Sequence, residues 1–175
     1  MNSGLRRARA QLAQVLPDED DVAEPAEPDR RVLLDRFATA FENGDVTALT
    51  ELLRQDVALE MPPMLTWFAG RETVRRFLAR MLPGVPGQFR MVPALANGQP
   101  AFAAYERDDD GVYRAHAVLV LTVTAAGIAR IVIFLSPALL GMFGLPQVSG
   151  PDAGHRAPDL AGPPAPDLAA ASWPR

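Results

Sequence analysis

Apolar residues in the first half of the chain recur at helical spacing in two segments, residues 30–43 and residues 72–82. The first segment ends at Asn43-Gly44, a pair that commonly stops a helix. The second segment keeps its apolar side chains on one side and its arginines on the other. Asp45 is placed to cap a further short helix that runs through Leu53. The pattern therefore predicts three helices.

The second half of the chain contains four strand-like runs. Turn-forming pairs such as Asn97-Gly98 and Ala126-Gly127 separate these runs. Helices followed by a meander of strands are typical of an α+β fold. We expect a curved antiparallel sheet folded over three helices, a cone that encloses an apolar pocket. The expected strands are residues 57–61, 89–95, 101–107, 112–124 and 128–135.

Charge is distributed unevenly along the 175 residues, whose 17 basic and 21 acidic side chains give a net charge of −4. Every basic residue is Arg, and seven of the acids fall in residues 17–29, a composition typical of an acidic linker. We expect a helical stub over residues 1–16, a nearly neutral domain over 30–146 and a disordered Pro- and Ala-rich tail over 147–175. The neutral domain argues against nucleic acid as a partner.

The residue types that the chain lacks limit its chemistry. Without Cys, it has no disulfides, thiolate zinc sites or Cys nucleophiles. Two His are too few for a His-rich metal site, and we expect neither a metal nor a cofactor. No apolar run is long enough to span a membrane, and the N-terminus lacks the layout of a signal peptide. We therefore expect a cytoplasmic protein without a membrane partner.

Motifs such as Glu60-Met61-Pro62 and Gly70-Arg71-Glu72 resemble the SnoaL-like branch of the NTF2-like superfamily. A closer resemblance is to the C-terminal SnoaL-like domain of extracytoplasmic-function sigma factors, carried by residues 59–63, 66–71, 96–105, 111–117 and 143–146. The first residues of the chain also resemble the end of the sigma region 4 recognition helix. The resemblance implies an NTF2-like cone, and it implies that a sigma core would lie before Met1.

The resemblance also points to three positions inside the cone. In the ketosteroid isomerase branch, a Tyr and a protonated Asp stabilise an enolate oxygen, and an Asp before a Pro moves the proton. These positions correspond here to Phe37, Leu119 and Met61, which are all apolar. The chain therefore cannot perform that enolisation with those groups, and we assign no catalytic residue.

The same register, together with strand alternation, predicts which side chains line the pocket. Ala115 and Ala117 are small and would leave room for a sizeable ligand, and Trp67 would stack on that ligand as a lid. His116 is expected to face away from the pocket. The complete predicted substrate-binding set is Phe37, Phe41, Leu53, Met61, Met64, Trp67, Leu78, Phe102, Ala104, Glu106, Ala115, Ala117, Leu119, Val132, Phe134 and Ser136.

Two functions fit this pattern. The first is an enzyme of polyketide metabolism that cyclises a hydrophobic substrate, or catalyses its cycloaddition, by the shape of an apolar pocket and without an acid–base pair. The second is a non-catalytic ligand-binding or regulatory domain of a sigma factor. We favour the first because the pocket positions depart from the sigma-domain pattern. The resemblance also implies a homodimer through the outer sheet face, with Tyr105, His116, Val118 and Val120 outward.

Overall fold

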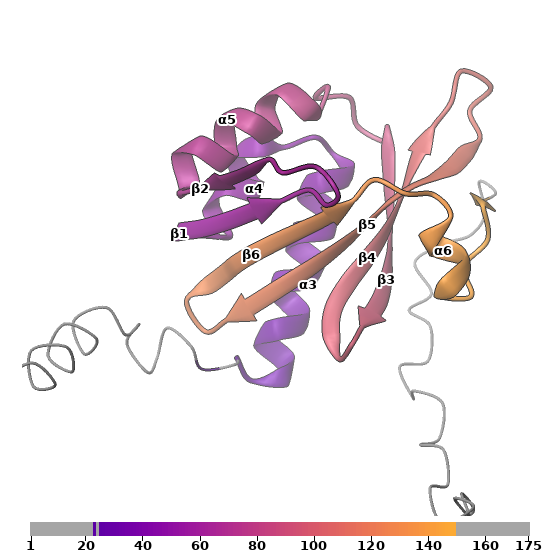
Figure 1. Ribbon diagram of the computed structural model, residues 1–175. Coiled ribbons are helices and arrows are strands. Elements are labelled where there is room, and N and C mark those ends of the chain that lie inside the picture. Colours follow the sequence, from indigo (N-terminus) through magenta and orange to yellow (C-terminus); the bar gives the residue numbers. More distant parts are fainter. Residues whose placement is uncertain (1–22, 24, 150–175) are drawn as a thin grey trace, which may run out of the picture.

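The computed structural model describes residue 23 and residues 25–149. The predicted stub over residues 1–16, most of the linker and most of the tail lie outside the described residues. Three helices lie on one face of a curved sheet, and a short fourth helix lies beside the opposite face (Figure 1). The fold is α+β, as the order of helical and strand patterns predicts.

Helix α3 (Glu27–Glu42) begins earlier than the apolar pattern predicts, inside the segment expected to be linker. Pro28 lies in its first turn, where the fixed φ of proline is favourable and its missing N–H leaves no bond unmade. Glu27 and Asp29 place negative charge at the same end, where it interacts favourably with the helix dipole. The last acidic residues of the expected linker therefore start the helix.

The end of α3 packs closely against distant parts of the chain. Gly44 has a φ of 62°, and a Cβ built there would lie 2.8 Å from the Cα of Gly84. Only glycine fits both this backbone conformation and this contact. The Glu42 carboxylate accepts a hydrogen bond from the Met91 N–H at 2.7 Å. These contacts fix the helix end against the sheet.

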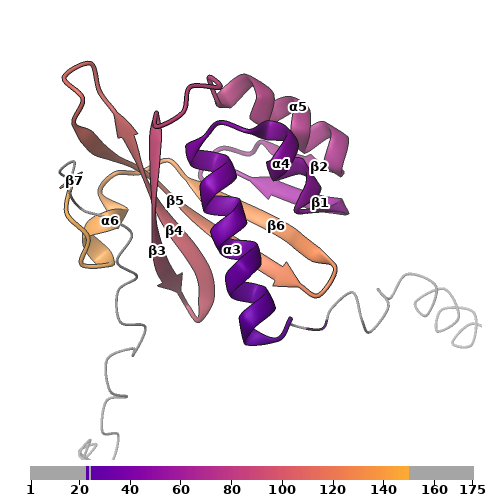
Figure 2. The same cartoon turned by 180° about the vertical axis from the view of Figure 1, so that it is seen from behind.

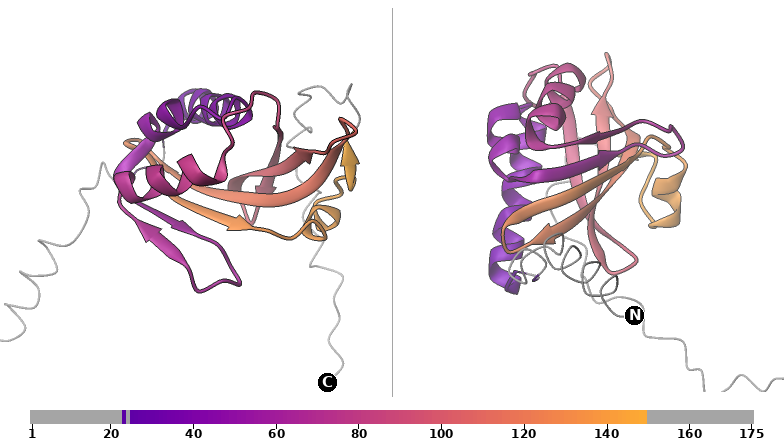
Figure 3. Two further views of the ribbon diagram at one scale, coloured as in Figure 1. Left: turned by 90° about the horizontal axis from the view of Figure 1, so that it is seen from above. Right: turned by 60° about the vertical axis from the view of Figure 1, so that its left-hand side comes forward.

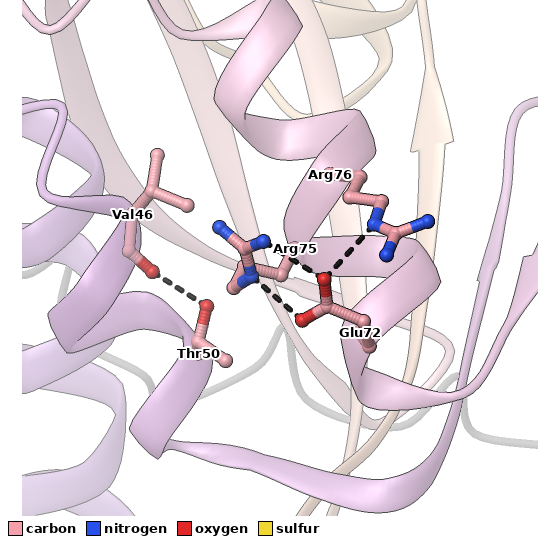
Figure 4. A network of polar contacts seen from close by, with 5 residues as sticks. All are labelled: Val46, Thr50, Glu72, Arg75 and Arg76. Carbon is pink, nitrogen blue, oxygen red and sulfur yellow. Dashed lines mark hydrogen bonds and ion pairs between the residues drawn. The ribbon is translucent and has the colours of Figure 1, made fainter.

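Helix α4 (Val46–Glu51) is shorter than the sequence pattern predicts, because the chain enters a strand at Leu53. Asp45 caps the helix as expected, accepting a hydrogen bond from the Ala48 N–H at 2.9 Å. The Thr50 hydroxyl donates to the Val46 carbonyl one turn earlier at 2.6 Å, so this polar group is satisfied within the helix (Figure 4).

Helix α5 (Arg71–Met81) carries a small ion network on its exposed side. Glu72 accepts hydrogen bonds from Arg75 at 2.7 Å and from Arg76 at 2.9 Å, three and four residues along the helix (Figure 4). The hydrogen bonds from Arg75 and Arg76 lower the pKa of the Glu72 carboxyl to about 2. The opposite side of the helix is apolar and packs on the first strand of the sheet.

Within the described residues the sheet has the strand order β2-β1-β6-β5-β4-β3, and β7 pairs with β5. Strands β1 and β6 are parallel, so the sheet is mixed. The expectation of a sheet that is antiparallel throughout is therefore wrong. The sheet curves around the helices (Figures 2 and 3). The strands are β1 (Leu53–Glu60), β2 (Trp67–Ala69), β3 (Phe89–Ala96), β4 (Gln99–Arg107), β5 (Tyr113–Thr124), β6 (Gly127–Phe134) and β7 (Val148–Ser149).

Three short elements were not expected from the sequence. Strand β2 extends the sheet beside β1, and helix α6 (Leu139–Met142) follows the last long strand. Strand β7 falls inside the segment predicted to be a disordered tail from residue 147. Its Val148 and Ser149 pair with the start of β5, so the ordered domain continues to the last described residue.

A β-bulge in β5 interrupts the alternation of its side chains. His116 is an extra residue between Ala115 and Ala117, whose partners Tyr105 and Ala104 are adjacent in β4. Side chains before the bulge therefore point to the face opposite to the one that simple alternation predicts.

A second bulge lies in β6. Ala129 is the extra residue here, because its two neighbours pair with Thr122 and Val123, which are adjacent in β5. The insertion turns the later residues of β6 over, so Ile131 and Ile133 join the core on the concave face. These two bulges decide which side chains face the interior.

Candidate functional site

The sheet and the three helices enclose a tightly packed interior. The Phe37 ring stacks on Phe102 with 5.9 Å between ring centroids and lies 6.0 Å from Phe41. The cavity that remains beside these rings has a volume of about 40 Å³. The sizeable pocket expected from Ala115 and Ala117 is therefore not found at that place, because aromatic side chains fill the space. A larger groove of about 490 Å³ lies between α3 and the β3–β4 end of the sheet, with Leu34, Pro93 and Phe102 in its lining.

Most of the predicted lining residues on the helices and on β1, β4 and β5 do face this interior. One group contacts the cavity itself, and another is buried in the same core. The cavity-lining residues are Phe41, Met61, Leu78, Ala104, Ala117 and Leu119. The buried core residues are Phe37, Leu53 and Phe102.

Four predicted lining residues lie elsewhere. Ala115, Val132 and Phe134 are on the outer face of the sheet, because the bulges at His116 and Ala129 reverse the alternation there. Ser136 follows β6 in the turn toward α6, where its N–H donates to the Phe134 carbonyl at 2.9 Å. The prediction that these four side chains line the interior is wrong.

The loop between β1 and β2 carries exposed apolar side chains. Trp67 is 66% exposed, Met64 47% and Leu65 99%. Trp67 therefore does not close over the interior cavity as the predicted lid. The neighbouring Phe68 packs against Phe77 of α5 with 4.4 Å between ring centroids, which attaches the base of the loop to the domain.

His116 and Glu106 form a polar pair at the edge of the interior cavity. The His116 Nδ1 lies 3.0 Å from a Glu106 carboxylate oxygen. The imidazole also contacts the Phe89 ring edge-on, with centroids 5.7 Å apart, and it lines the cavity. The bulge brings His116 to this face, so the prediction that it faces away is wrong. In the sequence, the pair was indicated only by the presence of an acidic residue and a His on two neighbouring predicted strands.

The outer face of the sheet holds a larger space. A cleft of about 610 Å³ lies between the sheet, the β3–β4 turn and α6. No charged residue lines it. Its lining consists of Leu95, Ala96, Asn97, Gln99, Val118, Val120, Val132, Phe134, Leu139, Met142 and Phe143.

The segment after β6 covers a part of the outer face next to this cleft. Leu140 of α6 is fully buried against Tyr105 and Val118. The Tyr105 hydroxyl donates to the Pro146 carbonyl at 2.9 Å, and burial raises the pKa of this hydroxyl. The outer face is thus partly covered, and the cleft lies where the cover ends.

A family model described as the SnoaL-like domain matches residues 34–132, which is more than half of the chain. The chain belongs to the SnoaL-like domain family. The match begins in α3 and ends in β6, so it includes both the three-helix layer and the curved sheet of this SnoaL-like domain.

The sequence of this SnoaL-like domain is similar to part of a sigma factor. It is 37% identical over 149 residues to the ECF RNA polymerase sigma factor SigG of Mycobacterium tuberculosis. The match covers 84% of this chain and 40% of that protein. The chain therefore spans about two fifths of the length of the curated relatives that it matches.

Solved structures share the fold of this SnoaL-like domain. An NTF-2 like protein of unknown function from Burkholderia xenovorans LB400 matches with a TM-score of 0.52 at 15% identity, covering 67% of this chain and 94% of that one. A de novo designed protein with a curved β-sheet matches with a TM-score of 0.53 at 16% identity, covering 69% of this chain and 95% of that one. The domain thus has the NTF2-like fold.

Across residue 23 and residues 25–149, no three His, Asp or Glu side chains are grouped as metal ligands would be. In the same part of the chain, no helix has the length and apolar character needed to span a membrane.

Proposed function

We propose that this SnoaL-like domain is a non-catalytic regulatory module that acts by contacting the promoter-reading part of an extracytoplasmic-function sigma factor. The observation that carries the proposal is the 37% identity to SigG over 149 residues. Both partners of such a contact work beside RNA polymerase, so the cytoplasmic location expected from the sequence is part of this proposal.

The chemistry of the interior supports a non-catalytic role. The three positions that carry polar catalytic groups in ketosteroid isomerases are Phe37, Met61 and Leu119, each no more than 5% exposed. The cavity beside them has a volume of only about 40 Å³. A buried apolar core of this kind stabilises the fold, and it offers no proton donor or acceptor at those positions.

The exposed apolar loop between β1 and β2 supplies a surface for a protein partner. Met64 and Leu65 of the loop, and Trp67 at the start of β2, are all exposed within a segment without charged residues between Met61 and Gly70. Large exposed apolar side chains, with Trp prominent among them, are typical of the central residues of protein interfaces. We propose that this loop contacts the sigma core.

A chimeric sigma factor tests the proposal. The part of SigG that matches this chain is replaced by the chain, and transcription from a SigG-dependent promoter is compared among SigG, the chimera and SigG without that part. We expect the chimera to restore the transcript level of intact SigG. Leu65→Asp should abolish the restoration, whereas the control Met142→Asp, which alters an apolar side chain that is 81% exposed on α6, should not. A chimera that is folded by circular dichroism but behaves like truncated SigG contradicts the proposal.

The outer cleft favours a second candidate, an enzyme that cyclises an apolar polyketide-like substrate. Its volume of about 610 Å³ lies within the range of about 300–1,000 Å³ that is usual for small-molecule sites, and its lining is uncharged. Such a substrate would be folded by shape, without a metal or cofactor.

Native mass spectrometry of the protein purified from its source organism tests this second candidate. A bound lipophilic metabolite that is lost after Val120→Asp supports the enzyme. A metabolite-free protein contradicts it, and a metabolite-free dimer supports instead the alternative that a second copy covers the outer face, as the family resemblance suggested.

A further inference from the structure

The ends of β4 and β5 bring Glu106 and His116 into contact at the edge of the concave face. The His116 Nδ1 lies 3.0 Å from a Glu106 carboxylate oxygen, within hydrogen-bond distance. The imidazole is an extra residue in the strand, so it leaves the regular alternation and turns toward the interior cavity. The bulge therefore places the polar imidazole of His116 among the apolar side chains that line the cavity.

The pairing fixes what the imidazole offers to a ligand. An ionised carboxylate only accepts hydrogen bonds, so a neutral His116 donates from Nδ1 to Glu106. The Nε2 of that tautomer keeps a free lone pair and is a hydrogen-bond acceptor. The nearby Arg114 is paired with Asp108 at 2.6 Å, so its charge is directed to that carboxylate.

The surroundings of the pair are apolar. Every other side chain that lines the cavity is aliphatic, aromatic or thioether, and the rim includes Met81 and Leu135, which are 46% and 39% exposed. The imidazole and the carboxylate are themselves 36% and 43% exposed, so a molecule can reach them from solvent. One oriented polar group on an apolar wall is the usual composition of a small-molecule site.

We propose that His116 and Glu106 form the polar end of a binding site for a small uncharged apolar molecule that carries one hydroxyl group. The hydroxyl donates to the His116 Nε2, and the apolar body lies over Met81 and Leu135 at the mouth of the cavity. The molecule is about the size of a monocyclic phenol, because its ring has to lie over the mouth and the cavity behind the mouth has a volume of only about 40 Å³. This inference rests on neither of the functions proposed above.

A set of phenol analogues tests the site. Phenol can donate a hydrogen bond, anisole can only accept one, and toluene can do neither. Each is titrated into the full chain labelled with ¹⁵N at a fixed, mildly alkaline pH. We expect phenol to shift the resonances of His116 and Ala117 and to bind about tenfold more tightly than anisole or toluene.

Two variants identify the groups responsible. His116→Phe keeps an aromatic ring but removes the acceptor, so phenol, anisole and toluene should bind equally. Glu106→Gln removes the carboxylate that holds the Nδ1 proton, so the affinity for phenol should fall severalfold and the ¹⁵N shifts of the imidazole should show a mixture of tautomers. The matched control is Glu60→Gln, which alters a carboxylate of similar exposure that is paired with Arg130 at 2.7 Å. It should leave both readouts unchanged.

Other outcomes overturn the proposal. Equal binding of phenol, anisole and toluene to the unaltered protein, or no binding of any of them, means that the pair only joins two strands. Retention of the phenol preference in His116→Phe means that another group accepts the hydrogen bond. Unchanged amide spectra at residues remote from β4 and β5 establish that each variant is folded.

Discussion

Both faces of the curved sheet carry apolar side chains, yet they differ in how completely they are covered. Three helices cover the concave face, where the stacked rings of Phe37 and Phe102 lie beside a cavity of about 40 Å³ and a groove of about 490 Å³ remains between α3 and the β3–β4 end of the sheet. A helix of four residues and the segment behind it cover part of the outer face, which retains a cleft of about 610 Å³. In this domain, the larger spaces for a ligand or a partner therefore lie at the edges of the covering layers.

The largest test of this comparison uses two consecutive residues of β5. Leu119 is 1% exposed on the concave face, and Val120 lines the outer cleft. Leu119→Asp places a carboxylate in the core and should lower the free energy of unfolding by about 4 kcal/mol or more. Val120→Asp lets the carboxylate reach water and should cost only about 1 kcal/mol. Urea unfolding followed by circular dichroism measures both. Equal losses would contradict the assignment of the faces.

Phenylalanine truncation on each face gives a smaller difference. Phe102→Ala removes a ring that is 3% exposed and stacked on Phe37, so it should destabilise the domain by about 3–5 kcal/mol. Phe134→Ala removes a half-buried ring at the cleft and should cost about 1–2 kcal/mol. The same unfolding measurement applies, and a larger loss for Phe134→Ala would mean that the outer face is as well packed as the inner one.

The cover of the outer face depends partly on one hydroxyl group. Tyr105→Phe removes the hydrogen bond to the Pro146 carbonyl and should cost about 1 kcal/mol. Amide hydrogen exchange should accelerate in α6 while the three-helix layer keeps its protection. The control is Tyr113→Phe, which removes a hydrogen bond to the Gly87 carbonyl at 2.7 Å. It should leave α6 unaffected, and faster exchange of α6 in both variants would assign the effect to general destabilisation.

The smallest effect is expected at a site that belongs to neither face. The folded-state pKa of Glu72 is about 2, below the ordinary value of 4.5, because Arg75 and Arg76 bind its charged form. The stabilisation from Glu72 is therefore fully present above pH 4.5 and is lost as the pH falls through about 2. A ¹³C titration of the side-chain carboxyl should show a midpoint near 2. Glu72→Gln should remove this pH dependence and leave the resonances of both sheet faces in place, and a midpoint near 4.5 would contradict the network.

Periodicity predicted the three helices and four of the long strands near their observed positions. The cap at Asp45 formed as expected because a short carboxylate before a helix satisfies a free N–H wherever the helix begins. The start of α3 was missed because Glu27 and Asp29 have the composition of a linker and also the charge that a helix N-terminus favours.

The candidate site was harder to predict than the fold, because two single-residue insertions decided it. The apolar runs that follow His116 and Ala129 do not show which face each side chain takes, and a bulge is defined by pairing with a partner strand. Each bulge reverses the faces of the residues beyond it. The reversal placed Val132 and Phe134 outside and His116 inside. Met61, which follows β1, and Leu78 of α5 do line the interior cavity, as the residue pattern predicted.

The parallel pairing of β1 with β6 has a consequence for how the chain is made. Leu59 of β1 pairs with Ile131 of β6. The edge of β1 that faces β6 therefore stays unpaired until β6 has been synthesised, long after β1 itself. Until then, that edge presents free backbone donors and acceptors, which are a template for pairing with another nascent chain. The domain must therefore complete nearly all of its synthesis before its sheet can close, and its yield in the cell should depend on how long the ribosome takes to reach β6.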